Sequence, residues 1–325
     1  MTFPKSTLKT ALMASVLALG ATAVLAEGVT IAVVGGKADD PFFAKVKKGI
    51  DDATLVVEAH GGTVNYLMLQ TYDNIGGDAA NLVRTAISQG ASVIAVPNWV
   101  PDTQDEAIKA AMDAGIPVLL YNSGGAAKAK ELGAINYIGN EEYPAGLAAG
   151  AYFGTHEVKN VICVNTVPGA QNLEDRCRGV SDGITPEGGV SNQLPLPASA
   201  FGDPTAVAEA IKATLLKDPT ITGVITISAG DANSAAIGIE QSGMTTVSLA
   251  SFDMDGAGLD RIKTGSQLFA VDQQPWLQGF LAVSMADAYA SFGTAIASAP
   301  VLTGPGIVDA ANVDATIAGA AAGFR

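Results

Sequence analysis

Carboxylates, amides, arginines and aromatic rings follow many of the apolar segments of this 325-residue chain. The stretch GGKADDPFFAKVKKGI at 35–50 follows an apolar run at 29–34 and ends in residues with helical spacing. Four such side chains lie between the run and the helix: Asp39, Asp40, Phe42 and Phe43. The side chains after the later runs include Tyr72, Asp73, Asn74, Asn98, Trp99, Asn122, Ser123, Gln171, Asn172, Arg176, Arg178, Phe201, Asp231, Asn233, Asp253, Asp255, Gln273, Gln274 and Trp276. Carboxylates and amides suit a polyhydroxylated ligand, whose hydroxyls both donate and accept, and rings pack on its C–H faces. No histidine, cysteine nucleophile or general base stands in an activating arrangement, so the set favours binding over catalysis.

Apolar runs rich in Val and Ile alternate with helical segments along the chain. The expected strands are 29–34, 64–69, 93–96, 118–121, 135–138, 161–165, 190–194, 224–227, 247–252 and 268–271. The expected helices are 42–59, 78–89, 103–114, 142–153, 171–183, 204–217, 232–242, 256–264 and 275–292. This alternation predicts an α/β fold of two similar lobes, each a parallel sheet with helices on both faces.

The two lobes should be joined by a multi-strand hinge, because no Ser- or Pro-rich linker separates the two sets of elements. We expect an N-terminal lobe of 27–138 plus 274–302 and a C-terminal lobe of 139–273 plus 303–325. In such sheets ligands bind beyond the carboxyl ends of the strands. The polar and aromatic side chains that follow the strands are therefore the candidate site.

Residues 1–26 read as a secretory signal peptide. Lys5 and Lys9 precede an apolar stretch, and small residues lead to a cleavage site after Ala26. The apolar stretch is short and interrupted for a membrane anchor, and Glu27 stands where a lipoprotein would have cysteine. The mature chain is therefore expected to be exported.

Composition and charge narrow the partners. The chain is 48% hydrophobic and 15% charged, a globular composition long enough for two cores. Its formal charge of −14 becomes −16 without the two leader lysines. An acidic chain without basic clusters argues against nucleic acid and against anionic membrane surfaces.

Five local strings, in order along the chain, carry a resemblance to a known family. They are DDPFF at 39–43, AGIPVLLYN at 114–122, RCRG at 176–179, SFDMDG at 251–256 and VDQQPWLQG at 271–279. Together with the leader and the two α/β halves, they resemble the type I periplasmic binding proteins of sugar ABC transporters, the ribose-binding subgroup especially. The resemblance covers essentially the whole mature chain.

The resemblance implies a set of ligand contacts: Asp40, Phe42, Phe43, Asn122, Arg176, Phe201, Asp253 and Gln273. Carboxylates and amides of both lobes would bind hydroxyls, Phe42 or Phe43 would stack on one face of a sugar, and Phe201 on the other. Two further contacts stay open, because the alignment allows either Asn98 or Trp99 after the third strand and either Asp231 or Asn233 later in the chain. Trp99 and Trp276 are equally suited to packing within a lobe.

Two departures from the family bear on the ligand. Asp40 replaces the second Asn of the family's box, and Asn122 replaces its usual Asp after the fourth strand. The carboxylate has in effect crossed the pocket, which favours a monosaccharide or sugar alcohol other than ribose. We expect Asp39 to cap the following helix and Asp40 to bind the ligand.

The implied function is capture of a small neutral sugar or polyol by hinge closure and its delivery to the permease of an ABC importer. A monomer is expected, and a chemoreceptor is a possible second partner. A repressor effector domain shares the fold, but the leader and the missing DNA-binding helices oppose it. A secreted carbohydrate-acting enzyme remains the alternative, with Asp40 and Asp253 as a pair of catalytic acids.

No cofactor or metal is expected. The sequence from Asp253 to Thr264 imitates a calcium loop, but position 5 is Ala257, which has no side-chain oxygen, and position 12 is Thr264 in place of the bidentate glutamate. Gly256, Gly258 and Arg261 lack the third glycine of a dinucleotide loop.

Cys163 and Cys177 are the only cysteines. An even pair in an exported protein indicates a disulfide, with two buried thiols as the alternative.

Overall fold

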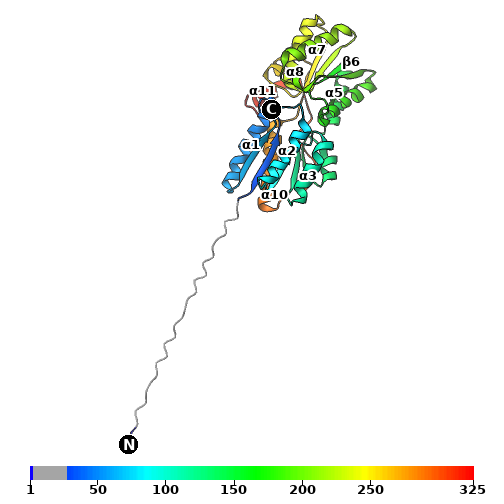
Figure 1. The fold of residues 1–325 in the computed structure, drawn as a ribbon. Coiled ribbons are helices and arrows are strands. Elements are labelled where there is room, and N and C mark those ends of the chain that lie inside the picture. The colour runs from blue at the N-terminus through cyan, green and yellow to red at the C-terminus, as the bar shows by residue number, and fades with distance from the viewer. Residues whose placement is uncertain (3–27) are drawn as a thin grey trace.

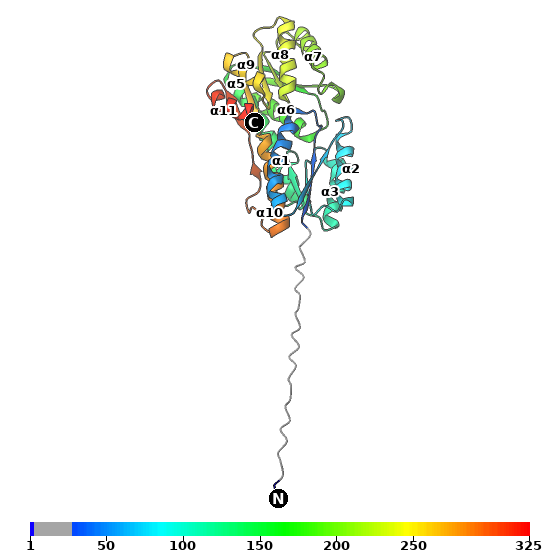
Figure 2. The ribbon, with the colours of Figure 1, turned by 90° about the vertical axis from the view of Figure 1, so that its left-hand side faces the viewer.

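The computed structural model describes residues 1–2 and 28–325, which form two α/β lobes (Figures 1 and 2). The expected leader and its cleavage after Ala26 therefore lie, but for the first two residues, outside the described residues. No helix in the described part of the chain is long and apolar enough to cross a membrane.

The first lobe is built on a six-stranded sheet of order β11-β5-β4-β3-β1-β2, in which all pairs are parallel. Its strands are β1 (Thr30–Gly35), β2 (Thr63–Met68), β3 (Val93–Val96), β4 (Val118–Tyr121), β5 (Tyr137–Gly139) and β11 (Val301–Leu302). Its helices are α1 (Pro41–Ala59), α2 (Ile75–Ser88), α3 (Pro101–Asp113), α4 (Gly125–Leu132) and α10 (Pro275–Phe292).

The second lobe repeats this plan with the order β12-β10-β9-β8-β6-β7. Its strands are β6 (Asn160–Asn165), β7 (Val190–Pro195), β8 (Gly223–Thr226), β9 (Ser248–Phe252), β10 (Phe269–Asp272) and β12 (Gly306–Asp309). Its helices are α5 (Glu142–Thr155), α6 (Gln171–Ile184), α7 (Pro204–Lys217), α8 (Ala229–Ser242), α9 (Gly256–Thr264) and α11 (Val313–Ala321), with short 3₁₀ turns at Thr185–Glu187 and Ala198–Ala200. Only β12 runs antiparallel to its neighbour.

Each sheet is covered on both faces, as its apolar strands require. In β1, Ile31 and Val33 join the core that includes α1 and α10, while the alternate residues Ala32 and Val34 join the core under α2 and α3. The second sheet separates α5 and α6 from α7 and α8 in the same way. The predicted fold class is therefore confirmed.

Helices α1 and α10 approach each other closely because glycine stands on both sides of their contact. A Cβ atom on Gly49 would collide with the backbone oxygen of Trp276, and one on Gly279 would collide with that of Val46. The contact joins the start of the first lobe to the helix that returns from the second.

The chain crosses between the lobes three times, at 140–141, 273–274 and 303–305, next to the ends of β5, β10 and β11. The last two crossings are bonded to each other. Gln274 Nε2 donates to Thr303 O at 2.6 Å, and Thr303 Oγ1 donates to Gln273 O at 2.8 Å. The connection is thus ordered and hydrogen-bonded, as the absence of a linker in the sequence predicts.

Several elements were not expected from the sequence. Helix α4, strands β11 and β12, and helix α11 were all absent from the expected set, and α2 and α8 each begin three residues earlier than expected. Strand β11 has two residues, too few to show a period.

Candidate ligand-binding cleft

A cavity of about 60 Å³ lies between the lobes at the carboxyl ends of the strands. We call it the inner cavity. It is lined by nine of the twelve residues that the sequence analysis selected: Asp40, Phe42, Phe43, Trp99, Asn122, Arg176, Phe201, Asp253 and Gln273. Tyr72 and Asn172, which belong to the wider set of residues after strands, line it too. The strand-end rule therefore brings together side chains that are far apart in the sequence.

The remaining three residues lie elsewhere. Asn98 is fully buried and donates from Nδ2 to Asp105 Oδ1 on α3 at 2.7 Å, so of the two residues after β3 Trp99 lines the inner cavity and Asn98 does not. Asp231 and Asn233 line an adjoining cavity instead. Neither member of this second open pair reaches the inner cavity.

Asp40 has two roles, and the prediction that Asp39 caps α1 is wrong. Pro41 is the first residue of α1, which puts Asp40 at the cap, and its Oδ1 accepts from the Phe42 backbone N–H at 2.8 Å. Its Oδ2 accepts from the Tyr72 hydroxyl at 2.5 Å. Burial raises the pKa of this carboxyl. Asp39 is exposed and pairs with Lys37 at 3.4 Å.

Asn122 and Asp253 have the same unusual backbone, one in each lobe. Their φ angles are 62° and 61°, in the left-handed region that non-glycine residues seldom adopt. Each directly follows a strand, β4 or β9, and each side chain lines the inner cavity. Strained backbone of this kind is concentrated at functional sites, where surrounding structure holds it in place.

The side chain of Asn122 is held by its neighbours. Its Oδ1 accepts from Trp99 Nε1 at 3.2 Å, and its Nδ2 lies 3.4 Å from Gln278 Oε1 on α10. Trp99 is in turn packed edge-on against Phe43, with ring centroids 5.8 Å apart. The first-lobe wall of the cavity is therefore preorganised.

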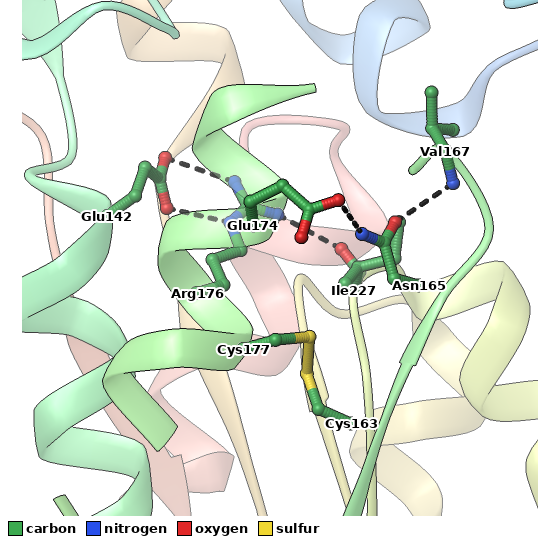
Figure 3. Close-up of a disulfide and its surroundings, with 8 residues drawn as sticks. All are labelled: Glu142, Cys163, Asn165, Val167, Glu174, Arg176, Cys177 and Ile227. Carbon is green, nitrogen blue, oxygen red and sulfur yellow. Dashed lines mark hydrogen bonds and ion pairs between the residues drawn. A yellow bond between two sulfur atoms is a disulfide. The ribbon is translucent and has the colours of Figure 1, made fainter. Parts of the chain in front are cut away.

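Arg176 is held by four hydrogen bonds, of which those to Glu142 and Ile227 are drawn in Figure 3. Its Nε and Nη2 donate to the two oxygens of Glu142 at 2.7 and 3.1 Å. Nη1 donates to Ile227 O at 3.0 Å, and Nη2 also donates to Gln273 Oε1 at 2.8 Å. Four of the five guanidinium N–H groups are thus used, and one on Nη1 remains for a ligand.

Glu142 was missed by the sequence analysis. It is buried at the first position of α5, just beyond β5, and its carboxylate forms a two-pronged pair with Arg176. Its sequence signal is a carboxylate shortly after the end of a strand, the same signal that marks Asp40 and Asp253. Arg176 therefore reaches Asp253 only through Gln273, whose Nε2 donates to Asp253 Oδ1 at 2.6 Å.

Cys163 on β6 and Cys177 on α6 form a disulfide, with Cα atoms 5.5 Å apart, and this prediction is confirmed. Figure 3 shows the bridge near Arg176, the residue before Cys177. The covalent link fixes the helical turn that carries Arg176 to the sheet beneath it.

Two acids of the cleft are harder to ionise than a free aspartate. Burial raises the pKa of Asp253 to about 7 and that of Asp231 to about 6. Arg176 lowers the Asp253 pKa, but its charge is shared with Glu142. Among the residues described, no cluster of three His, Cys, Asp or Glu side chains is placed to hold a metal ion.

Known proteins share this architecture. A carbohydrate transporter from Acidothermus cellulolyticus 11B, solved in complex with myo-inositol, is 32% identical with a TM-score of 0.83, over 91% of this chain and 99% of that one. GanP, a glucose-galactose binding protein from Geobacillus stearothermophilus, shares the fold at 21% identity, with a TM-score of 0.75 over 88% of this chain and 99% of that one.

The xylose/arabinose-binding protein XylF of Sulfolobus acidocaldarius is 28% identical over 260 residues, which are 74% of this chain and 61% of that protein. The match thus leaves more than a third of that relative's length uncovered. Residues 31–294 match the periplasmic binding protein domain family. The chain belongs to this family, as the five strings in its sequence indicate.

Proposed function

We propose that the protein captures a monosaccharide or sugar alcohol in the periplasm and delivers it to the permease of an ABC importer. The observation that carries this proposal is the inner cavity, where acceptors, donors and aromatic faces from both lobes converge. Asp40 and Asn122 would bind hydroxyls from the first lobe, and Asp253 and Arg176 from the second. The sugars named for the related proteins support the same ligand class.

Capture would proceed by hinge closure, with 27–138 plus 274–302 moving against 139–273 plus 303–325. Contacts between the lobes surround the cavity: the Gln171 backbone N–H donates to Trp99 O at 2.7 Å, and Lys45 Nζ donates to Met254 O at 2.8 Å. A ligand bonded to both lobes adds to these contacts only in the closed state, so it shifts the population towards closure. The permease would recognise that closed shape.

The screening experiment is a thermal-shift series over pentoses, hexoses, polyols and inositols, with titration calorimetry on each hit. We expect at least one neutral polyhydroxylated ligand to bind, and small-angle scattering to show compaction. Chemical turnover of the bound sugar would instead favour the carbohydrate-acting enzyme. Absence of any binder across the series would contradict the proposal.

Adjacent acids supply a matched pair of variants. Asp40→Ala removes a charged acceptor from the cavity and should weaken binding roughly ten- to a hundredfold, because such bonds contribute about 1.5–3 kcal/mol. It should also lower stability by about 1 kcal/mol through loss of the helix cap. Asp39→Ala should lower neither stability nor the affinity for a single sugar ring, since Asp39 is exposed and lines only the adjoining cavity. If Asp40→Ala bound the ligand as tightly as the wild type does, Asp40 would not contact the ligand.

A tryptophan signal should accompany binding. Trp99 lines the cavity, whereas Trp276 donates to Asp52 Oδ2 at 2.7 Å and lines neither cavity of the cleft. Trp276→Phe therefore leaves a protein whose fluorescence reports on Trp99 alone. Ligand should change that fluorescence.

A further inference from the structure

The cleft contains a second and larger cavity. Its volume is about 320 Å³, and we call it the outer cavity. The two cavities adjoin, because five residues line both: Asp40, Phe42, Phe201, Ser228 and Asp253. The volume of the outer cavity alone falls within the roughly 300–1,000 Å³ that small-molecule sites occupy.

The outer cavity is present although the lobes are already in contact around it. Lys45 and Met254, which both line it, are joined by the hydrogen bond from Lys45 Nζ to Met254 O. Phe201 lines both cavities and packs edge-on against Tyr72 of the other lobe, with ring centroids 5.0 Å apart. Further closure would have to break or compress these contacts, so hinge motion alone does not remove the space.

Short side chains create this space at the beginning of α8. Ser228, Ala229 and Gly230 stand where other strand ends of the cleft carry long side chains. A Cβ atom on Gly230 would meet only Ser228 Oγ, at 3.9 Å. Because the φ angle of Gly230 is not positive, its backbone does not require glycine. The missing side chain therefore contributes room rather than a turn.

The walls of the outer cavity repeat the chemistry of the inner one. Phe42 and Phe201 offer aromatic rings to both, and Asp231, buried beside them, accepts from Thr166 Oγ1 at 2.9 Å. Asn233 is fixed between Asp255 and Arg261 by bonds of 2.8 and 2.7 Å. The two residues selected from the sequence that miss the inner cavity thus both line the outer one.

We propose that the outer cavity is a subsite for a second sugar ring, linked through a glycosidic oxygen to the ring held in the inner cavity. The ligand class then extends from monosaccharides and sugar alcohols to disaccharides and glycosyl-cyclitols. The second ring packs against Phe201 and donates a hydroxyl to Asp231. This inference depends on the proposed function, since it needs a sugar in the inner cavity.

Matched ligand pairs test the subsite on the unaltered protein. Xylose is compared with xylobiose, glucose with cellobiose, and myo-inositol with its galactoside, by titration calorimetry. We expect at least one two-ring ligand to bind as tightly as its single-ring partner or more tightly. Binding of single rings with rejection of every two-ring partner would overturn the subsite and leave the proposed function standing. Binding of neither kind would contradict both.

A filled outer cavity provides the second test. Gly230 lines the outer cavity, so Gly230→Phe adds a ring at its wall, and Gly230→Ala is the control that adds only one methyl group. We expect the Phe variant to weaken two-ring binding at least tenfold relative to the Ala variant, with single-ring binding changed less than twofold. Melting temperatures establish folding, and Gly230→Leu replaces the Phe variant if that unfolds. Unchanged two-ring binding, or equal loss for both ligand sizes, would overturn the assignment.

Discussion

Removal of the Glu142 carboxylate would leave the Arg176 guanidinium charged and unpaired where its side chain is only 3% exposed. Breaking a buried ion pair in this way costs about 3–5 kcal/mol, because the remaining charge has lost both solvent and partner. Typical domains have only about 5–15 kcal/mol of total stability. Glu142→Ala should therefore lower the free energy of unfolding by a large fraction of its total.

The double variant Glu142→Leu/Arg176→Met distinguishes two quantities: the net contribution of the ion pair to stability, and the cost of leaving one of its charges unpaired. Apolar residues of similar volume remove both charges, and such replacements are often neutral or stabilising by about 1–4 kcal/mol. We expect the double variant to be as stable as the wild type or more so. Its ligand affinity should still be lost, because Gln273 loses the bond that orients its amide and the free N–H of Arg176 is gone.

Guanidinium chloride unfolding followed by circular dichroism measures these effects, and calorimetry measures affinity. Arg178 supplies the control: it lies two residues further on, is 61% exposed, and pairs with Asp175 at 2.7 Å. Arg178→Ala should cost at most about 1 kcal/mol, as surface ion pairs do. The reasoning fails if Glu142→Ala costs less than 1 kcal/mol, or if the double variant is no more stable than Glu142→Ala.

Three further outcomes are expected. Reduction of the disulfide should lower the free energy of unfolding by about 3 kcal/mol, because the bridge closes a loop between residues 14 positions apart and so restricts the unfolded chain. Thermal melts with and without reductant measure this, and an unchanged midpoint would contradict it. Because burial raises the pKa of Asp253 from 3.8 to about 7, the folded state retains a proton that the unfolded chain releases, and stability should fall as pH rises between these values. Asp253→Asn should then gain on the wild type above pH 7 and converge with it near pH 4 in unfolding titrations; parallel curves would refute the assignment. Gly49→Ala should destabilise by at least about 1–3 kcal/mol through its clash with Trp276, whereas Gly256→Ala, in open space, should be neutral; thermal melts of both decide.

The sequence predicts the order of elements well because buried parallel strands and amphipathic helices have distinct periods. The sequence predicts an element less well where only pairing with a distant strand makes it a strand. Strand β11 exists because Val301 and Leu302 pair with Ile138 and Gly139, more than 160 residues away, and no local pattern in two residues can show this. Helix α4 is a similar case, eight residues that begin with glycine.

The residues of the candidate site could be predicted from the sequence where they directly follow a strand. The rule cannot decide which of two neighbouring side chains faces the cleft, since successive residues of an extended segment point in opposite directions. Asn98 and Trp99 illustrate this limit: one turns to α3 and the other to the cavity. The choice between Asp39 and Asp40 as helix cap could be made from the sequence. Proline usually occupies the first position of a helix, so Pro41 makes Asp40, the residue before it, the cap.

The hinge and the cleft share one hydrogen-bonded network, and this has a consequence for closure. Gln273 holds Arg176 and Asp253 through its side chain, while its backbone oxygen accepts from Gln278 Nε2 at 3.1 Å and from Thr303 Oγ1 at 2.8 Å. Gln278 Oε1 in turn faces Asn122 Nδ2 of the first lobe. In the proposed mechanism a ligand that bonds to Asp253 and Asn122 therefore acts on both ends of a network that runs through the hinge itself. Since packed hydrogen-bonded elements favour discrete arrangements over gradual deformation, ligand contacts at either lobe should select the same closed state.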